Sequence, residues 1–189
     1  MRHPDRHNDA ELAQLARDDA TAFDTLYRRH VTAIYRFCYA RSNSIADAED
    51  LTAQTFLAAL DTLDSYEGRG SFRGWLFGIA RHKCADLHRS RRRQVEASLE
   101  DAVSFGTAVP GRSDPGPAPE EAARDALLLD CVKRMLPQLS PARQEAVQLR
   151  YWGNLELEEV AGAMGRSVAA VKMLISRGIA DLRKRCPNA

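Results

Sequence analysis

Apolar side chains recur at intervals of three and four residues along most of the chain, which is the spacing of one face of an α-helix. The stretch SIADAEDLTAQTFLAALDTL has this spacing and carries its acids early, where they favour the positive end of a helix dipole. Strand-like alternation is absent. Between Asp9 and about Arg41 one helix face is predicted by these apolar positions: Leu12, Leu15, Phe23, Leu26, Tyr27, Ile34, Phe37 and Cys38. The pattern therefore predicts an all-α fold.

One segment has no helical period. Between about Glu96 and Glu121 the sequence collects four of the eight prolines, together with glycines and acids, a composition typical of linkers. A chain of 189 residues has room for two small domains. We therefore predict two small helical domains, at residues 9–94 and 124–187, joined by a flexible acidic linker that contains Pro and Gly at 95–123.

The formal net charge of +1 conceals four segments of alternating sign. Residues 42–67 carry six acids and no base, and residues 69–93 then carry eight bases and one acid. Residues 94–130 have a net charge of −6 and residues 164–186 a net charge of +5. Each predicted domain thus contains one strongly basic module, and basic modules favour a polyanionic partner such as nucleic acid.

The first basic module, RGSFRGWLFGIARHKCADLHRSRRR, also contains an apolar face. If residues 71–89 form one helix, that face is Phe72, Trp75, Leu76, Ile79 and Leu87, so a core role for Trp75 is favoured over base stacking. The opposite face carries Gly74, Gly78 and Arg81. Two glycines within a helix cost about 1 kcal/mol each relative to alanine, so we expect a large body to approach this face, and a nucleic-acid backbone suits its charge.

The second basic module, LEEVAGAMGRSVAAVKMLISRGIADLRKR, has the order of a helix-turn-helix. Gly165 permits a tight turn and Ser167 can cap the second helix. If that helix enters a major groove, the side chains left for DNA are Ser167, Ala169, Ala170, Lys172, Met173, Ser176 and Arg177, and Arg166 is expected to meet phosphates. Lys172 and Arg177 are the hydrogen-bonding candidates. A generic helical hairpin remains the alternative, and Arg183 to Arg185 suit either phosphate contacts or a solvated helix end.

Other classes of site are weakly indicated. The four cysteines are far apart without a Cys-x-x-Cys pair, so we expect free thiols. Helical spacing does not bring His82, Cys84 and His88 to one point, which argues against a metal site. No cofactor motif is present. Without a long apolar run or a signal peptide, we expect a cytoplasmic protein with no direct membrane insertion.

Taken in order, DAEDLTAQTFLAAL, FRGWLFGIARHKCADLHRSRRR, the acidic linker and LSPARQEAVQLRYWGNLELEEVAGAMGRSVAAVKMLISRGIADLRKR resemble the extracytoplasmic-function class of bacterial sigma factors. The resemblance implies a transcription initiation subunit that binds the clamp and flap regions of the RNA polymerase core and promoter DNA, with no catalytic site. It also implies an anti-sigma factor as a partner, and a linker directed toward the RNA path of the polymerase.

The resemblance assigns roles to particular residues. Contact with the polymerase clamp is implied for Asp47, Asp50, Gln54 and Phe56. Contact with the downstream promoter element, including a flipped base held by the glycine loop, is implied for Tyr66, Arg69, Arg73, Arg81, His82 and Arg89. Contact with the upstream element is implied for Arg166, Ser167, Ala169, Lys172, Met173, Ser176 and Arg177. His82 replaces the asparagine usual in the class, and Met173 with Leu174 replaces a common Ser-Arg pair, which is expected to alter promoter preference.

Two other functions fit parts of the sequence. A stand-alone regulator would use the helix-turn-helix on an operator and the first domain for a ligand or a dimer contact, but it leaves the first basic module unexplained. A nucleic-acid enzyme would need metal-binding carboxylates, and the acids at 47–50 could mimic them. No histidine or lysine is spaced to complete such a site.

Overall fold

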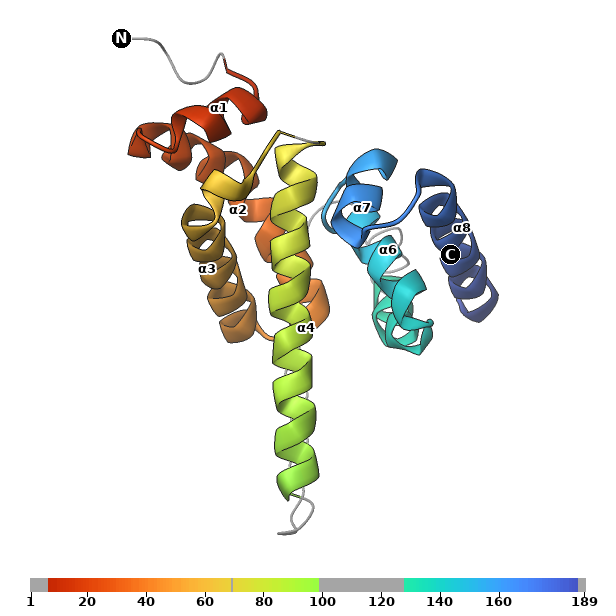
Figure 1. Cartoon of the computed structure of the whole chain (residues 1–189). Coiled ribbons are helices and arrows are strands. Elements are labelled where there is room, and N and C mark those ends of the chain that lie inside the picture. The colour runs from red at the N-terminus through yellow and green to blue at the C-terminus, as the bar shows by residue number, and fades with distance from the viewer. Residues whose placement is uncertain (1–6, 69, 99–127, 187–189) are drawn as a thin grey trace, which may run out of the picture.

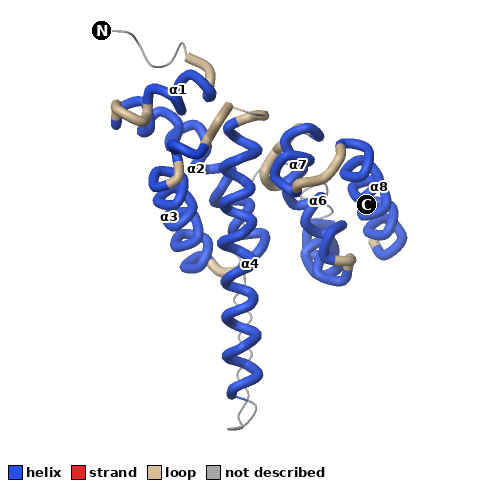
Figure 2. Tube along the Cα trace, viewed as in Figure 1, coloured by secondary structure: helices blue, strands red, loops and turns tan. Residues whose placement is uncertain are grey.

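The computed structural model describes residues 7–68, 70–98 and 128–186, and within these ranges it contains helices and turns without a strand. This confirms the all-α prediction (Figures 1 and 2). In chain order the elements are α1 (Asp9–Leu15), α2 (Ala20–Ser42), α3 (Ile45–Asp61), a 3-10 turn (Leu63–Ser65), α4 (Phe72–Ser98), a helix over 128–135, a 3-10 turn (Leu136–Gln138), α6 (Pro141–Tyr151), α7 (Leu157–Met164) and α8 (Val168–Arg185). None of these described helices is long and apolar enough to span a bilayer.

Local capping explains where the first helices begin. The Asn8 side chain accepts from the Glu11 N–H, and the Glu11 side chain closes a capping box, so α1 begins at Asp9. Asp19 accepts from the Thr21 N–H at 2.8 Å and starts α2. The single helix face predicted from Asp9 to about Arg41 is therefore divided between two helices. Leu15 and Tyr27, both predicted on the buried face, are 47% and 41% exposed.

The helix α4 is longer than predicted and lies along α2 and α3 (Figure 1). Phe72 and Leu76 are buried, and Trp75, Ile79 and Leu87 pack against the same core, as the apolar spacing predicted. The helix continues through Ser98, so the predicted domain boundary at residue 94 falls inside it. Most of the predicted linker at 95–123 lies outside the described residues.

The carboxy-terminal unit contains the predicted helix-turn-helix. Gly165 ends α7 with φ +61°, a left-handed conformation that favours glycine, and its N–H bonds to the carbonyls of Ala161 and Gly162. The Ser167 hydroxyl caps α8 by accepting from the Ala170 N–H at 3.3 Å. Val171 and Ile175 return α8 to the core. Both the turn and the cap are the ones expected from the sequence.

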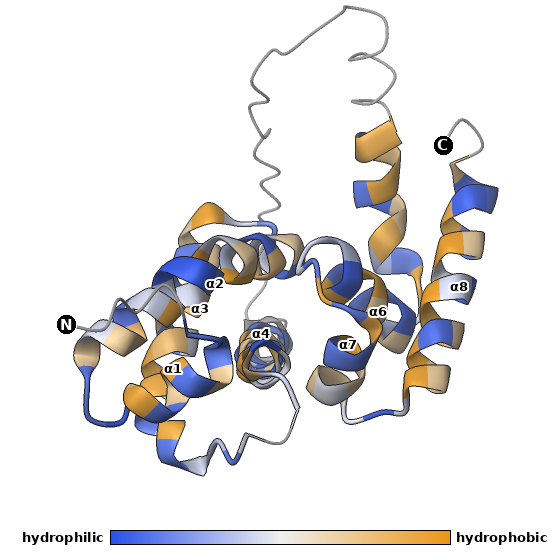
Figure 3. Cartoon of the chain, turned by 90° about the horizontal axis from the view of Figure 1, so that it is seen from above, coloured by the Kyte–Doolittle hydropathy of each residue, from blue (hydrophilic) through white to orange (hydrophobic). Residues whose placement is uncertain are grey.

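The two units pack against each other through one continuous core. Figure 3 shows α4 with α2 and α3 on one side and α6 and α7 on the other. Residues from both units, including Phe77 on α4 and Leu155 before α7, belong to the same buried cluster. Gly153 permits this approach, because an added Cβ would lie 2.7 Å from the Phe77 ring and 2.6 Å from the Leu149 carbonyl.

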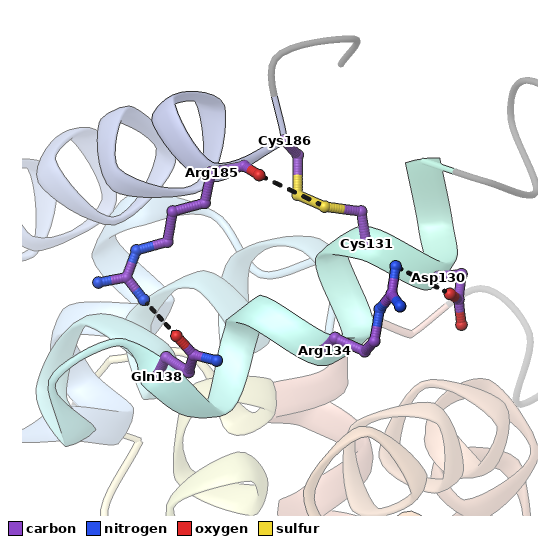
Figure 4. Close-up of a disulfide and its surroundings, with 6 residues drawn as sticks. All are labelled: Asp130, Cys131, Arg134, Gln138, Arg185 and Cys186. Carbon is purple, nitrogen blue, oxygen red and sulfur yellow. Dashed lines mark hydrogen bonds and ion pairs between the residues drawn. A yellow bond between two sulfur atoms is a disulfide. The ribbon is translucent and has the colours of Figure 1, made fainter.

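The prediction of four free thiols is correct for one pair and wrong for the other. Cys38 and Cys84 are free and buried in the core, with their sulfur atoms 4.0 Å apart. Cys131 and Cys186 form a disulfide (Figure 4). They are 55 residues apart in sequence, so spacing gave no signal. The antiparallel course of the helix over 128–135 and α8 brings them together.

Candidate nucleic-acid interface

One face of α8 is free for a ligand. Of the residues predicted to face upstream DNA, Ala170 is half-buried. The others are exposed, and they lie at the amino end and along one face of the helix: Arg166, Ser167, Ala169, Lys172, Met173, Ser176 and Arg177. The apolar side chain of Met173 is 52% exposed. The two cationic donors, Lys172 and Arg177, lie little more than one turn apart. This arrangement suits entry of α8 into a major groove, where such donors bond to base acceptors.

A groove beside α8 was not expected from the sequence. It has a volume of about 550 Å³ and is lined by residues of α6, α8 and the start of α7, among them Tyr151, Leu157 and Lys172. Tyr151 is 58% exposed although it ends an otherwise well-packed helix. The signal in the sequence that could have indicated this groove was Tyr151, an aromatic residue outside the apolar period of α6.

Two arginines of α4 that were predicted to contact DNA are bonded to the carboxy-terminal unit. The Arg73 Nη2 donates to the Gly153 carbonyl at 2.7 Å, and its Nη1 lies 3.8 Å from Glu159 Oε2. The Arg81 Nε donates to Glu145 Oε1 at 2.9 Å, and its Nη1 donates to the Ala163 carbonyl at 3.3 Å. In this closed arrangement neither guanidinium is available to a phosphate.

The glycine face of α4 is covered by protein. A Cβ on Gly74 would lie 3.2 Å from the backbone oxygen of Glu159, so α7 makes the close approach for which nucleic acid was proposed. Ser71 Oγ accepts from the Gly74 N–H at 2.9 Å and donates to Glu159 Oε1 at 3.0 Å. Gly78 is less crowded, because its added Cβ would meet only the Ala163 oxygen at 3.9 Å. The expectation of a large neighbour is met within the chain.

A third polar connection joins α2 to α6. Gln148 is fully buried, and its Nε2 donates to the Ala40 carbonyl at 2.8 Å. The Arg41 Nη1 donates to Gln148 Oε1 at 3.3 Å. The buried Nε atoms of Arg41 and Arg73 have no hydrogen-bond partner among the described residues. The interface between the units is thus polar as well as apolar, and it leaves these two buried N–H donors without a hydrogen-bond partner among the described residues.

Other predicted downstream contacts lie on the outer surface. His82 and Arg89 are exposed on α4. Arg89 pairs with Asp86 one turn earlier, and this hydrogen bond lowers the pKa of Asp86 despite slight desolvation. Arg91 reaches α3 and donates to Asp47 Oδ2 at 2.5 Å. Arg69 lies outside the described residues.

Tyr66 is part of the core and does not present a free stacking surface. Only 4% of it is exposed, and its ring lies 5.5 Å from that of Phe72 and 5.4 Å from that of Trp75. Its hydroxyl donates to the Gly70 carbonyl at 3.2 Å, and burial raises its pKa. Contact between this ring and an unstacked base would require the loop to rearrange. The ring contacts also agree with the core role favoured for Trp75.

The predicted polymerase face on α3 is only partly exposed. Asp50 and Gln54 are exposed and joined by a 2.7 Å hydrogen bond. Phe56 is buried, with its ring 4.7 Å from that of Tyr27, so it supports the helix from inside. Asp47 is half-buried, and its pKa is lowered because bonds from Ser44 and Arg91 outweigh desolvation, the largest single effect.

Sequence reasoning missed Leu57. Its side chain is 62% exposed and follows Asp50 and Gln54 at intervals of four and three residues, so the three share one face of α3. Leu60, 47% exposed, lies beside them. The available signal was that position 57 lies outside the apolar period of Leu51, Thr55 and Ala59.

Comparison with known proteins gives a consistent result. The family models for Sigma-70 region 2 and Sigma-70 region 4 match residues 26–94 and 129–182. The chain is 35% identical to the ECF RNA polymerase sigma factor BldN of Streptomyces coelicolor over 94% of its own length, but it spans only 66% of BldN. It is 34% identical to the RNA polymerase sigma factor CnrH of Cupriavidus metallidurans, covering 90% of this chain and 89% of CnrH.

A solved structure resembles the arrangement of both units. The structure of CnrH in complex with the cytosolic domain of CnrY matches with a TM-score of 0.68 and 28% identity, covering 93% of this chain and 95% of that one. A match of this extent includes helices from both units.

Proposed function

Because the chain belongs to the extracytoplasmic-function sigma factors, a membership carried by the region 2 and region 4 matches and by its similarity to the ECF sigma factor BldN, we propose that it is a dissociable transcription initiation subunit. It binds the RNA polymerase core, contacts two promoter elements and promotes DNA opening in the cytoplasm. It contributes binding energy to this process and no catalytic group of its own.

The observation that carries this proposal is the order of two modules in one chain. A region 2 match precedes a region 4 match, and each module leaves a different kind of surface exposed. On α3 the exposed row of Asp50, Gln54 and Leu57 suits a protein partner, since it combines an acid, an amide and an apolar side chain. On α8 the exposed face with Lys172 and Arg177 suits DNA.

The proposed roles follow from these surfaces. The α3 row binds the polymerase clamp, with Phe56 holding the helix from inside and Asp47 tying it to α4. The exposed His82 and Arg89 contact the downstream element in the arrangement described, whereas Arg73 and Arg81 reach it only after the two units separate. The carboxy-terminal unit contacts the upstream element and the polymerase flap.

A regulatory partner is part of the proposal. CnrH, whose structure resembles this chain, is in complex with the cytosolic domain of CnrY. By analogy, an anti-sigma factor binds this chain and favours the closed arrangement, in which α7 covers part of α4. The anti-sigma factor and the transcription machinery then compete for the exposed apolar residues of α3 and for the groove beside α8.

Run-off transcription on genomic fragments tests this function. The expected result is promoter-specific RNA only when core polymerase and the chain are both present. Lys172→Ala and Arg177→Ala are each expected to lower the yield by about 5- to 150-fold, because one good bidentate base contact contributes about 1–3 kcal/mol of discrimination.

Core binding needs its own matched control. Leu57→Ala is expected to weaken binding of the polymerase core, while Leu129→Ala, at another exposed leucine, is expected to leave it unchanged. Failure of the folded chain to bind core polymerase would overturn the proposal. Tight operator binding by the isolated chain, without polymerase, would instead favour the stand-alone regulator.

A further inference from the structure

The disulfide between Cys131 and Cys186 joins the two ends of the carboxy-terminal unit. Cys131 lies in the helix over 128–135, and Cys186 is the residue that follows α8 (Figure 4). Their Cα atoms are 6.1 Å apart, a separation that a disulfide can span without backbone movement. The linkage therefore fits the packing of the two helices.

Besides the disulfide, a small apolar cluster and a hydrogen bond hold this corner of the molecule. The cluster is separate from the main core, its buried members are Leu136, Leu139, Val147 and Leu182, and Val132 and Met135 of the helix over 128–135 pack against it. One further contact is the hydrogen bond from Arg185 Nη1 to Gln138 Oε1, at 2.8 Å and exposed (Figure 4). Exposed hydrogen bonds contribute little net stability. The covalent bond therefore adds to a small apolar contact in attaching this helix to α8.

The cysteines differ in their access to solvent. Cys131 is partly exposed, with its sulfur 3.7 Å from the Arg185 carbonyl, whereas Cys186 is 3% exposed. Cys38 and Cys84 are completely buried in the main core, and the hydrogen bond from Cys84, with burial, raises the pKa of Cys38. A small thiol or disulfide can thus reach Cys131 but not the buried pair. A reachable disulfide in a reducing compartment is characteristic of a redox-responsive bond.

We propose that Cys131 and Cys186 form a reversible dithiol–disulfide site whose oxidant is a low-molecular-weight disulfide, and that its oxidation state controls the attachment of residues 128–139 to α8. Of the proposed function, this inference uses only the cytoplasmic location, which is a reducing compartment. It concerns a modification of the chain and a local structural change, and both can be measured without polymerase or DNA.

The chemistry balances as two exchange steps. The Cys131 thiolate attacks the small disulfide, which forms a mixed disulfide and releases one small thiolate. The Cys186 thiolate then attacks the Cys131 sulfur, which forms the protein S–S bond and releases the second small thiolate. The protein loses two electrons and two protons, and the small disulfide is reduced to two thiols. Excess small thiol reverses both steps, attacking first at the accessible Cys131 sulfur.

The test uses the full wild-type chain equilibrated in a series of reduced and oxidised glutathione ratios. Free thiols are trapped with a maleimide and counted by mass spectrometry with peptide assignment. Amide hydrogen exchange is measured on the same samples. The expected result is one transition that removes two thiols, at Cys131 and Cys186. Across the same transition, exchange in residues 128–139 becomes at least about tenfold slower in the oxidised chain, while α3 does not change.

The double substitution Cys131→Ser and Cys186→Ser provides the control. Its residues 128–139 are expected to exchange at the fast rate in every buffer. The wild-type comparison stands without it if the variant fails to fold. Three results would overturn the proposal: both thiols remaining free at every glutathione ratio, a transition at Cys38 and Cys84 instead, or disulfide formation that leaves exchange in 128–139 unchanged.

Discussion

If Arg73 and Arg81 are to contact DNA as proposed, α7 must leave the face of α4, and Gly74 offers a way to shift that equilibrium. Replacement of Gly74 by alanine places a Cβ 3.2 Å from the Glu159 backbone oxygen and 3.5 Å from its Cα. Backbone atoms of α7 cannot rotate away, so α7 must retreat by a few tenths of an ångström. The closed arrangement is expected to weaken.

The magnitude follows from two opposing effects. Alanine within a helix is favoured over glycine by about 1 kcal/mol, and this gain applies to α4 in both the closed and the open states. Overpacking of a tight contact costs about 1–3 kcal/mol, and this cost applies mainly to the closed state. The open fraction should therefore rise by about 5- to 150-fold although α4 itself becomes more stable.

Gly78→Ala is the matched control, because it lies on the same helix face one turn later. Its added Cβ would meet only the Ala163 oxygen at 3.9 Å, an ordinary van der Waals distance. It should give the same helix stabilisation without opening the units. Because Ser71 Oγ also lies 3.2 Å from the new Cβ of Gly74→Ala, the free energy of unfolding is measured for both variants.

Single-molecule energy transfer measures the open fraction directly. Dyes are introduced bio-orthogonally at Glu49 on α3 and at Lys184 on α8, both exposed and one in each unit. Gly74→Ala should populate a low-transfer state that Gly78→Ala does not, and added salt should enlarge it because the Arg81–Glu145 pair is screened. Identical distributions for the two variants would refute the argument that α7 contact controls opening.

Three further outcomes are expected. Hydrogen bonding from His30, opposed by burial and assisted by Arg29, lowers the pKa of Asp9. The ionised Asp9 therefore stabilises the fold above its unfolded pKa of about 4, and this stabilisation is lost as pH falls through the lower folded pKa. Asp9→Asn should thus flatten the fall in unfolding free energy that urea titration measures below pH 5. Phe56→Ala should lower the unfolding free energy by about 3–5 kcal/mol, whereas Leu57→Ala should change it by less than about 0.5 kcal/mol. A larger loss for Leu57→Ala than for Phe56→Ala would place Phe56 on the surface. Ser167→Ala should cost about 1 kcal/mol through loss of the α8 cap, measured by thermal unfolding, with the exposed Ser176→Ala as its neutral counterpart.

Local chemistry was predictable from the sequence. Gly165 and Ser167 define the turn of the helix-turn-helix through backbone conformation and capping, and both effects depend only on neighbouring residues. The helices α3 and α4 follow from apolar spacing for the same reason. The break between α1 and α2 was missed because the apolar period runs through it, although the Asp19 and Thr21 cap is a local signal that marks it.

Long-range partners were not predictable. The charge of Arg73 and Arg81 indicates an acidic partner equally well whether that partner is a phosphate or the carboxylates of Glu145 and Glu159, which lie more than 60 residues away. The glycines of α4 indicate a close neighbour without identifying it. Phe56 fits a helix period that leaves open which face is buried. In each case the residue type specifies an interaction, while the tertiary arrangement selects the partner.

The closed arrangement combines features of a stable interface with features of an exchangeable one. Phe77, Leu155 and Gly153 form a continuous apolar contact between the units, which favours closure. However, the Nε atoms of Arg41 and Arg73 are buried without partners, and an unsatisfied buried donor costs about 1–3 kcal/mol. Opening returns both groups to water, and on the proposed function a phosphate can then accept from the Arg73 Nε, which has no partner among the described residues in the closed state. On the proposed function, the same α4 face binds either α7 or promoter DNA, and competition between the two is the proposed basis of switching.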